Sequence, residues 1–420
     1  MNKSTRNDFS PDADGLALAV QQLVECRQAR AAMPAHGTRI PELPSALPVQ
    51  GLGGRTALEY LAPWALDRSA RLDAPGFIAH MDPPTPWMTW AAAMWVAGTN
   101  QNLLHPDAAP VARDLEARVV DWLAPWFGMR GGHMVPDSTL GNLTALWAAR
   151  DVAGAKRIVT SEDSHVSIVK AGHILGLPVE RLPVDASRAL RAVQFNEDLS
   201  DAALVLTAGT TAVGAIDCLT EPRRAAWVHV DAAWAGPLRM TKHSALLDGT
   251  EQADSVAVSA HKWLYQPKES ALVFFAQPDR VAQALTFGGS YLAQPNVGLL
   301  GSHGATALPL LATLLAWGLE GVRERIESDM VIAQRLADRV QVEPELQLWG
   351  QPRTGIVVWR PRKGDPLQLR ERLQDAWVST ATINGEVWFR SVATNPLADP
   401  DRLVDAVLNA IGVRHTNSTD

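Results

Sequence analysis

The sequence predicts an α/β protein whose mainly parallel sheet lies between about residues 130 and 280. Short apolar runs alternate here with segments of helical periodicity, the pattern of a sheet with crossover helices. The runs are nearly continuous rather than alternating in polarity, as in strands that are buried on both faces. Polar residues at 210, 231 and 262 follow three of the runs, at the strand ends where such sheets bind ligands. We therefore expect a functional site at this edge of the sheet.

Five strands are predicted in this region, namely 157–160, 203–207, 227–230, 255–258 and 271–275. A long helical stretch at 321–340 leads out of the region and into a second, smaller unit. This unit contains two predicted strands, 355–359 and 386–391, and a closing helix at 399–411 that begins at capping aspartates.

A length of 420 residues suits two or three domains rather than one core. Helical spacing at 15–27 is followed by a Pro- and Gly-rich stretch at 35–54, which we interpret as an extended arm. We therefore expect an N-terminal helix and arm at 1–60, a large α/β domain at 61–320 and a small α+β C-terminal domain at 321–420.

The charge and cysteine content argue against several classes of protein. A net charge of −7 disfavours a nucleic acid or an anionic membrane as the main partner. The two cysteines, Cys26 and Cys218, lie far apart without metal-ligand spacing, so we expect no metal site and a reducing compartment. The most apolar run, 307–317, is shorter than the roughly 20 residues that cross a bilayer. With a polar start that lacks a signal-peptide core, these features predict a cytoplasmic protein.

Lys262 is the first candidate for chemistry. It follows the apolar strand 255–258 and precedes Trp263, and burial of an ammonium is costly and lowers its pKa. An amine with a lowered pKa can form a Schiff base with an aldehyde. The alternative is a surface lysine near a strand end, the commoner fate of lysines, but the apolar neighbours favour the Schiff-base role.

Asp231 is the second candidate, at the end of the apolar run 227–230. A Schiff-base lysine paired with a carboxylate for a pyridinium nitrogen is what pyridoxal 5′-phosphate (PLP) requires of a protein. The carboxylate holds the ring nitrogen protonated, so that the ring can draw electrons from a carbanion at the substrate's α-carbon. The alternative is an aspartate that caps a turn. We favour the first interpretation and expect PLP as the cofactor.

A phosphate site is expected where residues 137–146 enter a helix. The hydroxyl groups of Ser138 and Thr139 and the free backbone N–H groups there suit an anion, although such residues also start ordinary helices. Ser259 and His261 flank the lysine and could add donors. His165 on its own would be interpreted as a structural or surface histidine.

Several motifs occur along the chain in one order: Gly-Thr-Thr with a later Gly and Asp at 209–217, His-Val-Asp-Ala-Ala-Trp at 229–234, Ala-Asp-Ser at 253–255, and His-Lys-Trp-Leu at 261–264. Together they resemble the group II PLP-dependent decarboxylases, the family of glutamate, aromatic amino acid and histidine decarboxylases. The resemblance covers residues 60 to 411, including Phe-Arg-Ser-Val-Ala-Thr-Asn-Pro at 389–396. The combination is specific, whereas each motif alone is weak.

The resemblance implies PLP fold type I, which is aspartate aminotransferase-like, and a homodimer with shared active sites. It makes His165 the residue that stacks on the cofactor ring and places Ala233 against the other face. It places Thr210 beside the cofactor, and Ser259 and His261 near the phosphate.

The same resemblance assigns Arg390 to the substrate carboxylate, a task that suits a guanidinium fork. It also lets Ser302, after Gly301, reach the phosphate in the partner subunit. Lys262, His165 and Asp231 are then the expected catalytic residues.

The chain departs from the family pattern in two places. The usual Ser-Gly-Gly-Ser-Glu type of turn is replaced by Pro-Asp-Ser-Thr-Leu at 136–140, where the charge of Asp137 would repel a phosphate unless it points away. Residues 290–296 resemble the start of a mobile loop whose tyrosine helps to protonate the substrate carbanion, but the chain then runs directly into 298–303. We expect the segment with that tyrosine to be missing and Tyr291, before the gap, not to be its equivalent.

These observations predict a PLP-dependent lyase that removes the α-carboxylate of an amino acid as CO2 through a Lys262 Schiff base. One alternative is another PLP reaction on the same scaffold, such as aldehyde formation linked to decarboxylation or another carbon–carbon or elimination lyase reaction. A second alternative is a non-catalytic PLP-fold protein that binds or regulates. The substrate side chain is not predicted.

Overall fold

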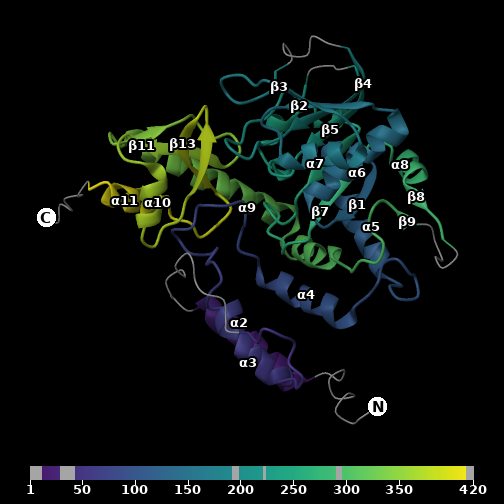
Figure 1. Ribbon diagram of the computed structural model, residues 1–420, viewed down its shortest axis with the longest axis horizontal. Helices are drawn as coiled ribbons and strands as arrows, with labels where there is room; N and C mark the ends of the chain where they lie inside the picture. The colour runs from purple at the N-terminus through teal and green to yellow at the C-terminus, as the bar shows by residue number, and fades with distance from the viewer. Residues whose placement is uncertain (1–11, 29–42, 192–197, 221–223, 290–295, 413–420) are drawn as a thin grey trace. The chain divides into compact units, whose positions relative to one another are not determined.

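The computed structural model describes residues 12–28, 43–191, 198–220, 224–289 and 296–412 (Figure 1). The chain divides into two compact units, Met1–Leu72 and Asp73–Asp420. The first contains α2 (Ala13–Gln28), which confirms the helix predicted at 15–27, and α3 (Gly54–Ala65), which packs against it. The domain boundaries expected at residues 60 and 320 stay predictions.

The second unit is built around a seven-stranded sheet with the order β1-β7-β6-β5-β4-β2-β3. Its strands are β1 (Gly131–Val135), β2 (Arg157–Ser161), β3 (Val179–Leu182), β4 (Leu199–Thr207), β5 (Ala225–Asp231), β6 (Ser255–Val258) and β7 (Ala271–Phe275). Strands β6, β5, β4, β2 and β3 are parallel, whereas β7 is antiparallel to both β6 and β1. All five strands predicted in this region are present, and the expected mainly parallel α/β fold is confirmed.

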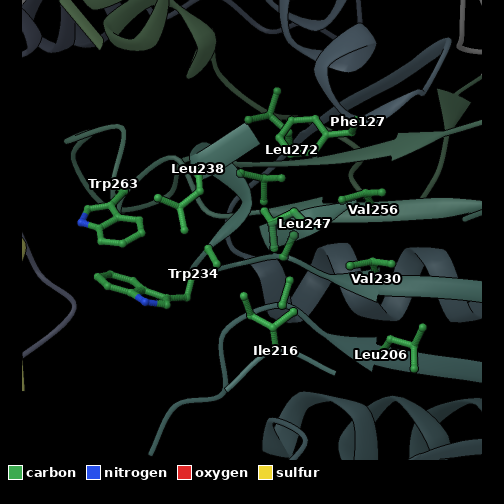
Figure 2. Packing of buried hydrophobic residues seen from close by; sticks show 14 of the residues in the cluster. Phe127, Leu206, Ile216, Val230, Trp234, Leu238, Leu247, Val256, Trp263 and Leu272 are labelled. Carbon is green, nitrogen blue, oxygen red and sulfur yellow. The ribbon is translucent and has the colours of Figure 1, made fainter. Parts of the chain in front are cut away.

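The sheet is buried on both faces, which explains the nearly continuous apolar strands. Helix α6 (Ser138–Ala153) packs across β5, β6 and β7, and α7 (Val166–Leu175) packs beside α6. On the opposite face, Leu206, Val230 and Val256 point into the larger hydrophobic cluster (Figure 2). Alternate residues of each strand therefore enter different cores, as the strand period of two requires.

The other helices of this unit are α4 (Trp87–Thr99), α5 (Ala112–Leu123), α8 (Pro278–Ala284) and α9 (Ala307–Val342). Helix α9 joins the apolar run at 307–317 to the helix predicted at 321–340, with Gly318 (φ 60°, ψ −176°) as a break between the two pieces. A short hairpin of β8 (Thr286–Phe287) and β9 (Asn296–Val297) precedes it. Among the described residues, no helix combines the length and the apolar character needed to span a bilayer.

A separate four-stranded antiparallel sheet forms the C-terminal part, with the order β10-β11-β13-β12. Its elements are β10 (Leu346–Leu348), β11 (Ile356–Pro361), α10 (Pro366–Arg372), β12 (Ser379–Ile383), β13 (Glu386–Val392) and α11 (Pro400–Ala410). The two predicted strands and the closing helix are confirmed, and the Asp399 side chain caps α11 by accepting the N–H of Asp401. The small α+β unit thus agrees with the prediction.

Candidate functional site

A cavity of about 210 Å³ lies at the carboxyl ends of the parallel strands, at the edge where ligands were expected. It brings together predicted site residues from four separate parts of the chain: Ser138, Thr139, His165, Asp231, Ala233, Ser259, His261 and Lys262. The carboxyl ends of β4, β5 and β6 are neighbours in the sheet, which explains why residues that are far apart in sequence converge.

Lys262 lies in the turn after β6 and is buried in the cavity wall. The turn is closed by hydrogen bonds from Lys262 N–H to Ser259 O (3.3 Å) and from Tyr265 N–H to Lys262 O (2.9 Å). Burial lowers the pKa of the Lys262 ammonium from 10.5 to about 8, although the negative charge of Asp231 opposes the shift. A substantial fraction of this amine is therefore neutral near physiological pH, as a nucleophilic lysine requires.

Asp231 is the last residue of β5, and its carboxylate is almost fully buried. Its Oδ1 accepts the N–H of Ala233 (3.1 Å), and its Oδ2 accepts the side-chain amide of Asn142 (2.9 Å). Asn142 also lines the cavity, and no sequence motif singled it out. The one sequence signal for Asn142 is its position, one turn inside the helix whose start was predicted to bind phosphate.

His165 is the N-cap residue of α7, and its ring lines the cavity. Its Nδ1 accepts the backbone N–H of Ser167 (3.3 Å) and lies 2.8 Å from the Ser167 hydroxyl oxygen. Burial lowers the pKa of His165; Asp231 opposes this effect and Lys262 adds to it. The imidazole is thus held neutral and in a fixed orientation.

The N-terminus of α6 provides hydroxyl groups at the cavity. The Ser138 and Ser259 hydroxyl oxygens lie 2.7 Å apart, which links the helix start to the lysine turn. Asp137 also lines the cavity, but its carboxylate caps the helix by accepting the N–H of Leu140 (2.9 Å). The carboxylate therefore points back at its own helix, where it occupies one of the free donors.

His261 lies on the other side of the lysine. Its Nδ1 is 3.1 Å from the carbonyl oxygen of Ser270, so the neutral ring donates its proton there. Burial lowers the pKa of His261 to about 4, and the nearby charges of Lys268 and Lys262 contribute.

Arg390 projects from β13 and is largely buried. Its Nε donates to the carbonyl oxygen of Thr211 (2.5 Å), a residue of the cavity wall, and Nη1 donates to the Ser379 hydroxyl group (3.2 Å). Burial lowers the pKa of Arg390 to about 10, a change that Asp82 opposes. The guanidinium therefore contacts the cavity wall at Thr211, close enough for its charge to act on Lys262, and stays charged at neutral pH.

Three predicted site residues do not line this cavity as the structure describes it: Arg390, which touches its wall only through Thr211, and Thr210 and Ser302. The Thr210 hydroxyl group accepts the N–H of Ala215 (3.0 Å) within its own turn, while its neighbours Gly209 and Thr211 line the wall. Ser302 accepts a hydrogen bond from the Asn102 side chain (3.2 Å) away from the cavity. Tyr291 lies outside the described residues, so the expectation about the family's loop tyrosine stays a prediction.

Two tryptophans join the site to the C-terminal sheet. Trp234 follows Asp231 by three residues and donates its indole N–H to Thr354 O (2.6 Å), and Trp263 donates to Ala393 O (2.9 Å). The two indole rings lie next to each other (Figure 2), and their centroids are 4.2 Å apart. The pair thus holds Asp231 and Lys262 at a defined distance from the sheet that carries Arg390.

The residues present fit PLP. The cavity offers an amine with a lowered pKa for an aldehyde, a carboxylate for a ring nitrogen and an imidazole for a ring face. Ser138, Thr139 and Ser259 add hydroxyl groups at a helix N-terminus for a phosphate. No group of three or more His, Cys, Asp or Glu side chains in the described part of the chain is arranged to hold a metal ion.

Comparisons with known proteins agree with this fit. The profile of the pyridoxal-dependent decarboxylase conserved domain matches residues 70–362. L-2,4-diaminobutyrate decarboxylase of Rhizobium meliloti (strain 1021) is 30% identical over 411 residues, covering 87% of this chain and 83% of the relative. A protein of the same name from Acinetobacter baumannii is 26% identical, covering 83% of this chain and 80% of the relative.

Solved structures show the same fold. The crystal structure of Oryza sativa TDC with PLP and tryptamine superposes with a TM-score of 0.84 at 20% identity, over 98% of each chain. The glutamate decarboxylase domain of a diaminobutyrate-pyruvate transaminase and L-2,4-diaminobutyrate decarboxylase from Vibrio parahaemolyticus gives 0.81 at 21% identity, over 95% of this chain and 94% of that one.

The predicted fold class, the PLP cofactor and the assignment as a carboxy-lyase that acts on an amino acid are thereby confirmed. The chain belongs to the pyridoxal-dependent decarboxylase family.

Proposed function

We propose that Lys262, Asp231, His165 and Arg390 carry out α-decarboxylation of an amino acid, with Lys262 as the residue that bears the cofactor. The observation that supports this proposal most is the buried amine of Lys262, with its pKa lowered to about 8, in one cavity with Asp231 and His165. When bound, PLP supplies an electron sink that stabilises negative charge at the substrate's α-carbon after CO2 leaves.

Each residue has a distinct task in this proposal. The Asp231 carboxylate would hold the ring nitrogen of the cofactor and favour its protonated form, because opposite charges stabilise each other at short range. His165 and Ala233 would hold the two ring faces. Ser138, Thr139, Ser259 and His261 would hold the phosphate, with the hydroxyl groups as donors. Thr210 supports the adjacent wall through its turn.

Arg390 binds the substrate carboxylate beside the cavity wall and orients the bond that breaks. Loss of CO2 leaves an electron pair on the α-carbon, which must then receive one proton. Lys262 Nζ, whose pKa lies near 8, is suited to hold that proton and to deliver it to the α-carbon. The products are one CO2 and one amine.

L-2,4-diaminobutyrate is the first substrate to test. Two relatives that cover most of this chain carry the name L-2,4-diaminobutyrate decarboxylase. Other relatives are named aspartate 1-decarboxylase and aromatic-L-amino-acid decarboxylase, so both amino acid classes belong in the same panel.

We also infer that the protein is a cytoplasmic homodimer with shared active sites, in which Ser302 reaches the partner's phosphate. Helix α4 supports a dimer because its apolar residues Trp87 and Trp95 are 69% and 63% exposed. The low cysteine content suits a reducing compartment.

The proposed reaction is tested with the purified protein, PLP and the amino acid panel. CO2 and a matching amine in equal amounts, lost in Lys262→Ala and strongly reduced in Arg390→Lys, are the expected result. Formation of aldehyde and ammonia would instead support the alternative reaction, aldehyde formation linked to decarboxylation. A PLP absorption band without product from any amino acid would favour a binding protein. A Lys262→Ala variant that kept the wild-type band would refute the lysine assignment.

A further inference from the structure

A chain of buried polar side chains lies behind Asp231 and extends away from the cavity. Trp227, His229 and Asp231 occupy alternate positions of β5, so they face the same side of the sheet, toward α6. Ser255 faces them from the neighbouring strand β6, directly opposite His229 in the register. Asn142 faces them from α6, and none of these five side chains is more than 5% exposed.

The hydrogen bonds of the chain are continuous. Trp227 Nε1 lies 2.8 Å from Ser255 Oγ, which lies 2.9 Å from His229 Nδ1. His229 Nε2 lies 2.9 Å from Asn142 Oδ1, and Asn142 Nδ2 lies 2.9 Å from Asp231 Oδ2. The reaction described above needs only the last of these residues.

The end at Trp227 agrees with one direction of donation. An indole N–H can only donate, so Ser255 Oγ accepts from it and can direct its own hydrogen to His229 Nδ1. The neutral imidazole then carries its single proton on Nε2, which donates to Asn142 Oδ1. Burial lowers the pKa of His229 to about 4, in agreement with a neutral ring.

The end at Asp231 gives the same direction independently. A carboxylate can only accept, so Asn142 must present its NH2 group to Asp231 and its carbonyl oxygen to His229. That oxygen in turn requires a hydrogen on His229 Nε2. The end at Asp231 therefore sets one arrangement of the amide and one tautomer of His229, and the end at Trp227 agrees with both.

A branch carries this arrangement to His165. The second hydrogen of Asn142 Nδ2 donates to Ser167 Oγ (2.8 Å), and Ser167 Oγ lies 2.8 Å from His165 Nδ1. The backbone N–H of Ser167 already donates to His165 Nδ1 (3.3 Å), so this nitrogen accepts and the Ser167 hydroxyl hydrogen can also point to it. The neutral His165 ring must then carry its proton on Nε2.

We propose that Asn142 is a positioning residue that couples Asp231 to His165, with Trp227, Ser255 and His229 fixing the direction of its amide. Through this amide, the Asp231 carboxylate receives a hydrogen bond of fixed direction and His165 is kept as the Nε2–H tautomer. The consequence for catalysis rests on the roles proposed above for Asp231 and His165. The predicted tautomers of the two histidines do not depend on those roles.

The tautomers can be read in the cofactor-free protein by 15N NMR of ring-labelled histidine. The His165 and His229 signals are assigned with His165→Gln and His229→Gln variants. We expect an unprotonated Nδ1 and a protonated Nε2 in both rings, since protonated and unprotonated ring nitrogens have well-separated 15N shifts. A proton on Nδ1 of either ring would overturn the proposal, whatever the protein does with PLP.

Two variants test the coupling. Asn142→Leu removes both donors at nearly constant volume, and Ser167→Ala removes only the branch and remains informative if the first variant does not fold. We expect the His165 signals to move toward a mixture of tautomers in both variants. Thr144→Val is the matched control, since Thr144 is buried on the same helix and donates only to its own helix carbonyl at Leu140 (2.7 Å).

PLP affinity provides a second measurement. A hydrogen bond to a charged group is lost in Asn142→Leu, so we expect its Kd for PLP to rise by about 10-fold or more, with a smaller change in Ser167→Ala. The pH dependence of the PLP absorption band should also shift in Asn142→Leu but not in Thr144→Val. Wild-type His165 signals together with a wild-type band in Asn142→Leu would overturn the coupling.

Discussion

Burial changes the chemistry of Lys262 more than any charge near it does. Removal of the ammonium from water is the largest cause of its lowered pKa, while the attraction of Asp231 limits the shift. An ordinary surface lysine is almost fully protonated at neutral pH. The turn after β6 therefore encloses the Lys262 amine and lowers its pKa, which makes the amine more nucleophilic at neutral pH.

The first prediction concerns the pH dependence of this amine. Only the neutral form attacks an aldehyde, so the rate at which cofactor-free protein reacts with pyridoxal should rise about 10-fold per pH unit below pH 8 and level off above it. Stopped-flow absorbance between pH 6.5 and 9.5 measures this rate. Lys262→Ala should lack the phase, and a midpoint near 10.5 would show that Lys262 is not buried as described.

The second prediction concerns Asp137, whose negative charge lies in the same cavity as the hydroxyl groups that we propose to bind phosphate. Asparagine caps helices as well as aspartate does, so Asp137→Asn should preserve α6 while it removes the repulsion. We expect tighter PLP binding by about five-fold and no change for pyridoxal, which lacks the phosphate. Fluorescence titrations give both affinities. Equal changes in the affinities for PLP and pyridoxal would show that the charge of Asp137 lies away from the phosphate.

At the scale of elements, helix α9 anchors the segment that follows the lysine. Tyr265 has a positive φ of 59° and is buried, and its hydroxyl group donates to Asp329 Oδ2 on α9 (2.5 Å). Asp329 Oδ1 has no hydrogen-bond partner among the described residues. Burial raises the pKa of Asp329 well above its ordinary value, and that of Tyr265 well above 10. Burial therefore favours a protonated carboxylic acid at Asp329, although the hydrogen bond from Tyr265 acts to lower its pKa.

The third prediction follows from this pair. Because the folded protein holds the Asp329 proton more tightly than the unfolded chain, its stabilisation is complete below pH 3.8 and is lost as pH rises through the folded-state pKa. An asparagine side chain does not titrate, so Asp329→Asn should gain stability relative to wild type, by up to about 1.4 kcal/mol per pH unit in that window. Urea unfolding of cofactor-free protein from pH 4 to 8 measures the difference.

The control for this series is Asp338→Asn, an exposed position on the same helix. Its stability difference from wild type should stay constant with pH. A constant difference for Asp329→Asn as well would mean that Asp329 is ionised in the folded protein.

At the scale of the whole molecule, α4 presents an apolar surface that the described part of the subunit leaves uncovered. Its sequence is apolar around most of its circumference, and only Thr89 and Ala92 are buried. Trp87, Met94 and Trp95 are exposed. Such a surface is typical of a subunit interface.

The fourth prediction is that a charge on this helix weakens the proposed dimer. Trp95→Glu should shift the sedimentation behaviour from dimer toward monomer at micromolar concentration, because an unpaired carboxylate would be desolvated at the interface. Leu397→Glu, at a position that is also exposed (62%), should leave the assembly unchanged. A monomeric wild type, or a Trp95→Glu variant that stays as dimeric as wild type, would contradict this assignment of the interface.

Much of the architecture is encoded locally and could be predicted. The strands that become β4, β5 and β6 are continuous apolar runs, and burial on both faces of a parallel sheet requires that composition. The rule that ligands bind at the carboxyl ends of such strands was enough to place Asp231 and Lys262 together. The edge strands β1 and β3 and the short strands β8, β9, β10 and β12 were not predicted, because their tertiary partners rather than their composition make them strands.

The parallel sheet, the cofactor and the roles proposed for Lys262 and Asp231 follow from the amino-acid order alone, because strand composition and strand-end position are short-range properties. Only the folded chain shows that Asn142 joins Asp231 to Ser167 and His165. The same is true of the orientation of that amide by His229 and Ser255. It is also true of the contact of Arg390 with Thr211, 179 residues away. Hydrogen-bond direction and partner choice depend on side chains that meet only after folding, so no pattern along the chain could reveal them.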